Sequence, residues 1–141
     1  MGNPSAAATA AKPPTMPRLG VRIAGSGSMV PGRVVPNAQI AALCGSDDEW
    51  IFQRTGIRER RICDPKRGES NATLCAGALR HALESAGAAP TELDLIICGT
   101  ITQDMRCPST ACLVASELGC GTAAAWDLGA ACCGFVYSLN T

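Results

Sequence analysis

The chain has 141 residues, and its twelve Lys and Arg side chains balance its twelve Asp and Glu side chains. A net charge near zero provides no basic surface for nucleic acid or for an anionic membrane, so we expect neither as a partner. Apolar residues reach 47%, enough for a hydrophobic core, yet no apolar run is long enough to cross a membrane.

Cysteine is unusually common, with nine residues, an odd number. No two cysteines have the C-x-x-C spacing of a zinc or redox motif, and the sequence contains a single histidine, His81. The N-terminus also lacks the apolar core of a secretory signal. We therefore expect no metal site and no disulfide framework, but reduced thiols in a cytoplasmic protein. His81 is predicted to be a surface or partly covered side chain.

Residues 1–17 are rich in Ala, Pro, Ser and Thr and contain no acidic group. A segment of this composition cannot bury enough apolar surface to fold, so we expect a disordered tail. Residues 18–141 are then the folded part of the chain.

The folded part is predicted to begin with a strand at 19–24 (LGVRIA), ended by the glycine run 25–28 (GSGS). The run has no third glycine, and Pro31 and Gly32 prevent a helix directly after it. A nucleotide-binding loop is therefore only weakly indicated.

Two short helices are predicted next. Asn37 is expected to cap the first, which runs to Cys44. The second follows a capping box, with Ser46 as the cap and Glu49 three residues later, and it ends at Gly56. Residues 57–63 (IRERRIC) alternate in polarity and are predicted as a strand with a basic outer face.

A longer helix is predicted at 71–86, capped by Ser70 and ended by Gly87. The apolar run 94–100 (DLIICGT) is typical of a strand that is buried on both faces of a parallel sheet.

Pro108 is expected in the first turn of a helix that spans 109–118, and 123–127 is the next predicted strand. Strands that alternate with helices indicate an α/β fold with right-handed crossovers.

The final stretch, 126–140 (WDLGAACCGFVYSLN), predicts a strand end, a tight turn of small residues and the first turn of a helix, where Cys132 lies. Free backbone N–H groups and the helix dipole favour a thiolate there and can hold an oxyanion, as in acyl-transfer enzymes. Gly134 is expected to permit a close helix–strand contact or an unusual dihedral angle. The alternative is that Cys132 and Cys133 are small core residues.

Four segments resemble one family, β-ketoacyl-[acyl carrier protein] synthase III. They are the opening turn with Asn37, SDDEWI followed by RTGIRER at 46–60, PSTAC at 108–112, and DLGAACCGF at 127–135. The resemblance covers the chain from about residue 22 to residue 141. It implies the N-terminal half of a thiolase-like fold, with a mixed, mostly parallel sheet and helices on both faces.

The resemblance also implies a function, the initiating condensation of type II fatty acid synthesis. Cys132 would be the nucleophile that takes an acyl group from acyl-CoA, and its backbone N–H would be an oxyanion donor. Trp50 would lie on the adenine of CoA, and Arg54 would meet its phosphate groups. Without the resemblance, Trp50 reads as a half-buried core residue and Arg54 as a solvated helix charge. No permanently bound cofactor is implied, since CoA enters as a substrate thioester.

The family's catalytic His and Asn belong to its C-terminal half, and no residue here stands for them, so we expect the chain alone to fail in condensation. The expected partners are acyl-CoA, an acyl carrier protein and a second copy of the protein in a homodimer. Two alternatives stay open. One is a non-catalytic half-synthase that binds CoA or a partner chain, and the other is a polyketide- or quinolone-type condensing enzyme. A half-sheet would leave apolar surface uncovered in either case.

Overall fold

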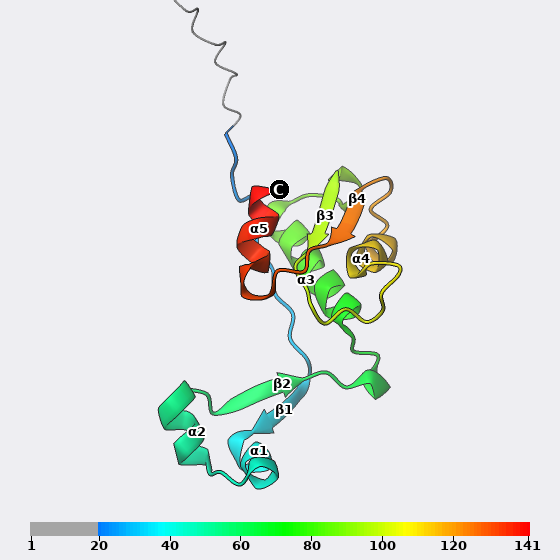
Figure 1. The fold of residues 1–141 in the computed structure, drawn as a ribbon. Helices are drawn as coiled ribbons and strands as arrows, with labels where there is room; N and C mark the ends of the chain where they lie inside the picture. The colour runs from blue at the N-terminus through cyan, green and yellow to red at the C-terminus, as the bar shows by residue number, and fades with distance from the viewer. Residues whose placement is uncertain (1–19) are drawn as a thin grey trace, which may run out of the picture.

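The computed structural model describes residues 20–141, so the tail predicted at 1–17 lies outside the described residues. The helices are α1 (Asn37–Cys44), α2 (Asp48–Thr55), α3 (Asn71–Ala86), α4 (Thr110–Leu118) and α5 (Gly134–Asn140). The strands are β1 (Arg33–Pro36), β2 (Glu59–Ile62), β3 (Leu95–Cys98) and β4 (Ala124–Asp127). Figure 1 shows a small part made of β1, β2, α1 and α2, and a larger part that contains the remaining helices and strands.

In the small part, β1 pairs antiparallel with β2, and α1 and α2 lie between the two strands in the sequence. Asn37 is almost fully buried where these elements meet. Its side-chain amide donates to Asp48 Oδ1 at 2.7 Å and to the carbonyl of Ile57 at 2.6 Å, and it accepts from Arg60 at 2.6 Å. The prediction that Asn37 caps α1 is therefore wrong, because its side chain is used in these longer-range bonds and Pro36 is the residue at the cap.

The cap of α2 is also one residue later than predicted. Asp47, not Ser46, precedes the helix, and its carboxylate accepts the N–H of Trp50 at 2.8 Å. A carboxylate at this position satisfies a free N–H and also favours the positive end of the helix dipole. The predicted end at Gly56 is confirmed, with the glycine in the left-handed conformation.

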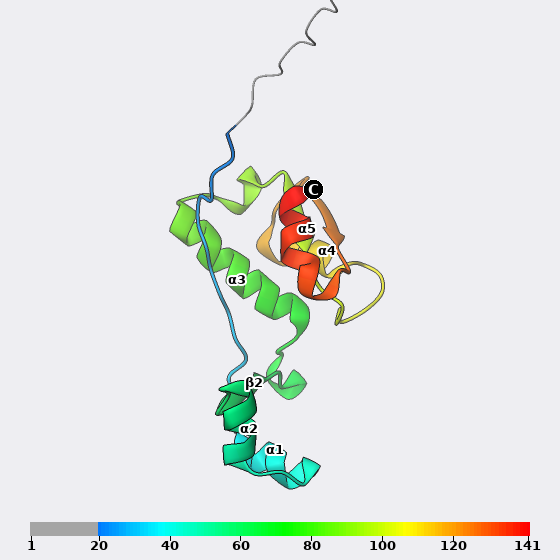
Figure 2. The same cartoon turned by 60° about the vertical axis from the view of Figure 1, so that its left-hand side comes forward.

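In the larger part, β3 and β4 pair in parallel, as predicted, with Cys98 opposite Asp127. Ile96 and Cys98 point into a core that they share with Ala111 of α4 and with Cys120. Leu95 is 40% exposed, so the strand is buried on one face rather than on both. Helices α3 and α4 cover the buried face, whereas α5 lies on the opposite side of the strands from α4 (Figures 1 and 2).

The α/β class is confirmed, but the described residues form two separate two-stranded sheets rather than one sheet. The strand predicted at 19–24 is absent from residues 20–24, and Val21 and Ile23 are exposed there. In 20–141 no helix is both long and apolar enough to cross a membrane.

The glycine run follows the outer surface of α3. A Cβ on Gly25 would collide with the backbone at Ala82 and Ala86, and one on Gly27 with the backbone at Ala78 and Ala82. The two glycines are therefore needed for close backbone packing. This packing accounts for the glycine run, so a nucleotide-binding role is not needed to explain it.

Helix α3 has the bounds that the sequence predicts, with Ser70 as its cap and Gly87 at its end. A carboxylate from a distant part of the sequence, that of Asp104, also binds the first turn of α3. Asp104 accepts the N–H of Asn71 at 2.9 Å and that of Ala72 at 2.8 Å. Desolvation, the largest single contribution, raises the pKa of Asp104, but the hydrogen bonds from these two N–H groups and from the Ser70 side chain together favour the charged form, so the pKa lies below its ordinary value.

We expect Asp104→Asn to lower the free energy of unfolding by about 1 kcal/mol at pH 7. A carboxylate whose pKa is lower in the folded state stabilises above its ordinary pKa, near ~3.9, and loses that effect as pH falls through the lowered value. The difference between wild type and variant should therefore shrink between pH 7 and pH 3. Urea unfolding at both pH values measures it, and an equal difference at both would contradict this role.

Candidate active site

The candidate site is the segment that follows β4. The chain leaves the strand at Asp127, and the N–H of Leu128 donates to the carbonyl of Cys98 at 2.8 Å, which extends the ladder by one residue. A 3-10 turn, Ala131–Cys133, then leads directly into α5. The predicted order of strand, turn and helix is present.

Ala131 makes this turn unusually sharp. Its φ is 45°, and it is the one non-glycine residue with a positive φ among residues 20–141. The left-handed region costs an ordinary L-residue about 1–2 kcal/mol. A residue held there reverses the chain within one turn, as at the strained elbows that carry nucleophiles.

Cys132 and Cys133 are both exposed at this turn. The alternative that they are core residues is therefore wrong for the described chain. Cys132 lies in the 3-10 turn and not, as predicted, in the first turn of the α-helix, because the conformation of Ala131 tightens the chain before α5 starts.

The backbone N–H groups at the start of a helical turn have no partner within it. The hydrogen bonds of this turn run from Cys133 to Ala130 at 2.9 Å and from Gly134 to Ala131. Neither bond uses the N–H of Cys132, which can therefore donate to a group beside the thiol.

Gly134 fixes the start of α5 against the end of β3. A Cβ on Gly134 would lie 3.5 Å from the Cα of Gly99, and a Cβ on Gly99 would lie 3.4 Å from the carbonyl carbon of Gly134. The predicted close helix–strand contact is confirmed, while the backbone of Gly134 is ordinary right-handed helix.

Trp50 and Arg54 lie together on α2. The indole is 52% exposed, and the guanidinium carbon of Arg54 lies 4.9 Å from the ring centroid. A cavity of about 450 Å³ opens beside the indole, lined by Trp50 and by residues 44–47. Trp50 is thus about half exposed at the surface and is not among the buried core residues, and Arg54 is stacked on it.

The structure does not bring α2 and the turn before α5 together. They belong to different parts of the chain and lie apart in both views (Figures 1 and 2). The candidate CoA-binding residues on α2 and the candidate nucleophile therefore lie in separate parts of the structure.

No protein-family profile matches the chain. It is 48% identical over 123 residues to the β-ketoacyl-[acyl carrier protein] synthase III of Desulfitobacterium hafniense, across 87% of this chain and 37% of that protein. The crystal structure of 3-oxoacyl-[acyl carrier protein] synthase III from Aquifex aeolicus superposes with a TM-score of 0.81 at 42% identity, over 86% of this chain and 38% of the other. The chain belongs to the β-ketoacyl-[acyl carrier protein] synthase III family.

This likeness confirms the expected thiolase-like fold of an N-terminal half. The chain spans 37% of the length of that synthase III relative, in its N-terminal part. A priming β-ketosynthase of a polyketide pathway is also similar, with a TM-score of 0.79 at 40% identity over 87% of this chain and 38% of the other.

Asp127 lies at the start of the segment that carries Cys132, and the sequence analysis gave it no role of its own. Its two carboxylate oxygens accept the N–H groups of Thr110 and Ala111, both at 2.8 Å. These are the first two residues of α4, so Asp127 caps the helix from the end of β4. Ser109 is the local cap and Pro108 precedes it, so the prediction of Pro108 in the first turn is wrong by two residues. The sequence signal that could have indicated this capping role is the acidic residue at the end of the predicted strand 123–127.

His81 lies on α3, away from the turn that carries Cys132 in the sequence and in its contacts. Its side chain is exposed, and Nδ1 lies 2.8 Å from the carbonyl oxygen of Ser28 in the glycine run. The predicted surface position is confirmed. Within the described part of the chain, no three His, Cys, Asp or Glu side chains gather where they could hold a metal ion.

Proposed function

We propose that this chain forms the acyl-accepting part of a synthase that starts fatty acid chains, with Cys132 as the nucleophile. The observation that carries the proposal is the elbow at Ala131, which presents an exposed thiol directly before α5. The 48% identity to a β-ketoacyl-[acyl carrier protein] synthase III supports the same chemistry.

In the acylation step, the thiolate of Cys132 attacks the carbonyl carbon of an acyl-CoA thioester. A new carbon–sulfur bond forms, negative charge develops on the carbonyl oxygen, and we propose the N–H of Cys132 as a donor that stabilises it. Collapse of the intermediate breaks the bond to CoA, whose sulfur leaves as a thiolate and takes up a proton. The product is acyl-Cys132 and free CoA.

The condensation step that follows acylation needs residues that are not among the 141 of this sequence. A carbanion formed by decarboxylation of malonyl-[acyl carrier protein] would attack the acyl-Cys132 thioester, releasing 3-oxoacyl-[acyl carrier protein] and restoring the thiol. A His and an Asn from the C-terminal half would stabilise that carbanion. We therefore assign condensation to the full-length cytoplasmic protein and acyl transfer to this part of it.

Partner chains are supported by the apolar surface of α5. Phe135, Val136, Tyr137 and Leu139 are all more than half exposed. A helix with this many exposed apolar side chains is covered in a stable protein, by the rest of the chain or by a second copy. This agrees with the homodimer that we expect.

The test of the proposed function is the intact mass of the full-length protein after incubation with acyl-CoA. We expect one acyl group per chain, removed by hydroxylamine as a thioester is. Absence of any acyl adduct with acetyl-, butyryl- and longer acyl-CoA would overturn the proposal.

For CoA binding we propose stacking of the adenine on Trp50 and contact of Arg54 with the phosphates. An exposed indole and a guanidinium suit these tasks. Trp50→Ala should weaken CoA binding by roughly 1–3 kcal/mol, or about 5- to 150-fold in Kd. Isothermal titration of the full-length protein with CoA measures it.

Phe52→Ala is the matched control, because Phe52 also lies on α2 and also carries a stacked guanidinium, that of Arg58 at 3.6 Å. It should leave the Kd nearly unchanged. Equal effects of the two substitutions would mean that α2 was merely disturbed, and no effect of Trp50→Ala would exclude stacking.

The second candidate is a priming enzyme of polyketide synthesis, which the 40% identity to a priming β-ketosynthase favours. The acyl-Cys132 step is common to both. The two candidate functions differ in the carrier protein that receives the first condensation product. A full-length enzyme that extends only a polyketide carrier protein would favour the second candidate.

A further inference from the structure

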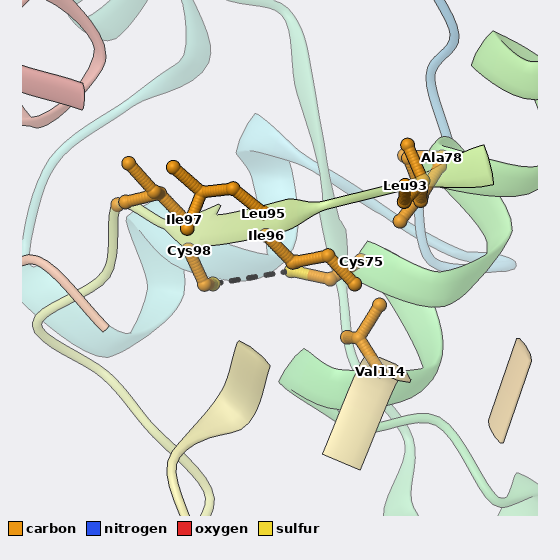
Figure 3. A pocket seen from close by; sticks show the side chains of 10 residues that line it. Cys75, Ala78, Leu93, Leu95, Ile96, Ile97, Cys98 and Val114 are labelled. Carbon is orange, nitrogen blue, oxygen red and sulfur yellow. Dashed lines mark hydrogen bonds between the residues drawn. The ribbon is translucent and has the colours of Figure 1, made fainter. Parts of the chain in front are cut away.

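Cys75 of α3 and Cys98 of β3 face each other across the interface between helix and strand (Figure 3). Their sulfur atoms lie 3.7 Å apart and are hydrogen-bonded. The two residues are 23 positions apart in the sequence, so the fold alone brings them together.

We propose that Cys75 and Cys98 form a reversible disulfide by exchange with a low-molecular-weight disulfide of the glutathione class. The pair does not include Cys132, and its chemistry does not rest on the proposed acyl transfer.

The two thiols are close to bonding distance. A disulfide has a sulfur–sulfur length near ~2.05 Å, so the sulfurs must approach by about 1.7 Å. The two side chains already point toward each other (Figure 3), so the fold presents the sulfurs to one another before a bond forms. All nine cysteines are free thiols in the structure.

A cavity of about 450 Å³ gives a small oxidant room to reach the pair. Its lining is mostly apolar and includes both cysteines, with Ala78, Leu79 and Leu93 near the open edge of β3. Cys75 is partly exposed, whereas Cys98 is 8% exposed. The incoming disulfide therefore meets Cys75 first.

The hydrogen bond also favours Cys75 as the attacking group. The S–H of Cys98 lowers the pKa of Cys75 to about 7, against burial and the carboxylates of Asp104 and Asp127, which raise it. The same bond and burial raise the pKa of Cys98. Cys75 therefore ionises first, because the hydrogen bond from Cys98 stabilises its thiolate.

The exchange then proceeds in two displacements. The thiolate of Cys75 attacks one sulfur of the small disulfide, forming a mixed disulfide and releasing one small thiol. The sulfur of Cys98 gives its proton to solvent and attacks Sγ of Cys75, which releases the second small thiol. Two protein thiols are oxidised to one disulfide, and one small disulfide is reduced to two thiols.

Tryptic mapping tests this in the wild-type full-length protein, because the sequence separates the two residues. Peptide 68–80 contains Cys75 alone, and peptide 81–106 contains Cys98 alone. After treatment with oxidised glutathione, alkylation and non-reducing digestion, we expect these peptides to appear joined, two hydrogens lighter than their sum. Dithiothreitol should return both.

Two variants separate the steps. Cys98→Ser should retain a glutathione adduct on Cys75, because no second thiol can displace it. Cys75→Ser should leave Cys98 without an adduct, since Cys98 is the buried partner. Persistence of the adduct on Cys75 in the wild type, with Cys98 still free for alkylation, would overturn the proposal.

Cys63 is the internal control, since it is also partly exposed and lies alone in peptide 62–66. Burial, Glu69 and Asp104 raise the pKa of Cys63. At pH 7 Cys75 should react with iodoacetamide roughly tenfold faster than Cys63, after allowing for the lower nucleophilicity of a more acidic thiol. Equal rates, or free alkylation of both Cys75 and Cys98 after oxidation, would also exclude the site.

Discussion

Cys132→Ala should abolish acyl-enzyme formation in the full-length protein, lowering the acylation rate by on the order of 10³-fold or more. The nucleophile supplies the atom that bonds to the acyl group, and no neighbouring group replaces it. The fold should be unaffected, because Cys132 is exposed and exposed substitutions change stability by about 0.5 kcal/mol or less. Intact mass after incubation with acyl-CoA measures the adduct, and chemical denaturation checks the fold.

Cys133→Ala is the matched control, since Cys133 is the adjacent residue and is equally a free, exposed thiol. It should leave the acylation rate nearly unchanged. If Cys133→Ala removed the acyl group and Cys132→Ala did not, the nucleophile would be Cys133. If neither did, acyl transfer at this turn would be excluded.

Asp127→Ala should lower the free energy of unfolding by roughly 2–6 kcal/mol. The carboxylate accepts the N–H groups of Thr110 and Ala111, and both residues are at most 1% exposed. Removing it leaves two buried donors unsatisfied, each costing about 1–3 kcal/mol. Because Asp127 ends the strand that leads into the turn that carries Cys132, acylation should slow as well. Urea unfolding and the acylation rate are the two measurements.

Asp104→Ala is the comparison that shows how much of the loss in stability at Asp127 comes from the burial of the N–H groups it caps. Asp104 also caps a helix through two backbone N–H groups, but its bond to Asn71 is exposed. We expect a loss of about 1 kcal/mol, within the range for caps near solvent. Asp127→Asn keeps one acceptor oxygen and should fall between the two alanine variants. If the losses for Asp104 and Asp127 were equal, buried unsatisfied donors would not explain the effect.

Elements whose signals are local could be predicted from the sequence. The limits of α3 follow from Ser70 directly before it and Gly87 directly after it, and both are present as predicted. The strand, turn and helix around Cys132 follow in the same way from the small residues and the apolar periodicity. Hydrogen bonds of caps and turns span three or four residues, so a short window of sequence contains all the participants.

Residues that act over long separations could not be assigned in this way. Asn37 is a residue type that often caps helices, but its side-chain amide donates hydrogen bonds to Asp48 and Ile57, 11 and 20 positions later. The run at 25–28 has the composition of a loop, yet its glycines pack on α3. In both cases a polar or small residue suits several local roles, and packing against a distant element selects one of them.

The sequence by itself determined the family, the segment that holds Cys132, and the helices α2 and α3 with their glycine ends. It did so because motif spacing, periodicity and capping are properties of neighbouring residues. Only the tertiary structure decided that Cys132 is exposed, that Asp127 caps α4, and that Cys75 meets Cys98. Each of these depends on where α3 and α4 pack on β3 and β4, because burial and side-chain contact follow from the space between elements.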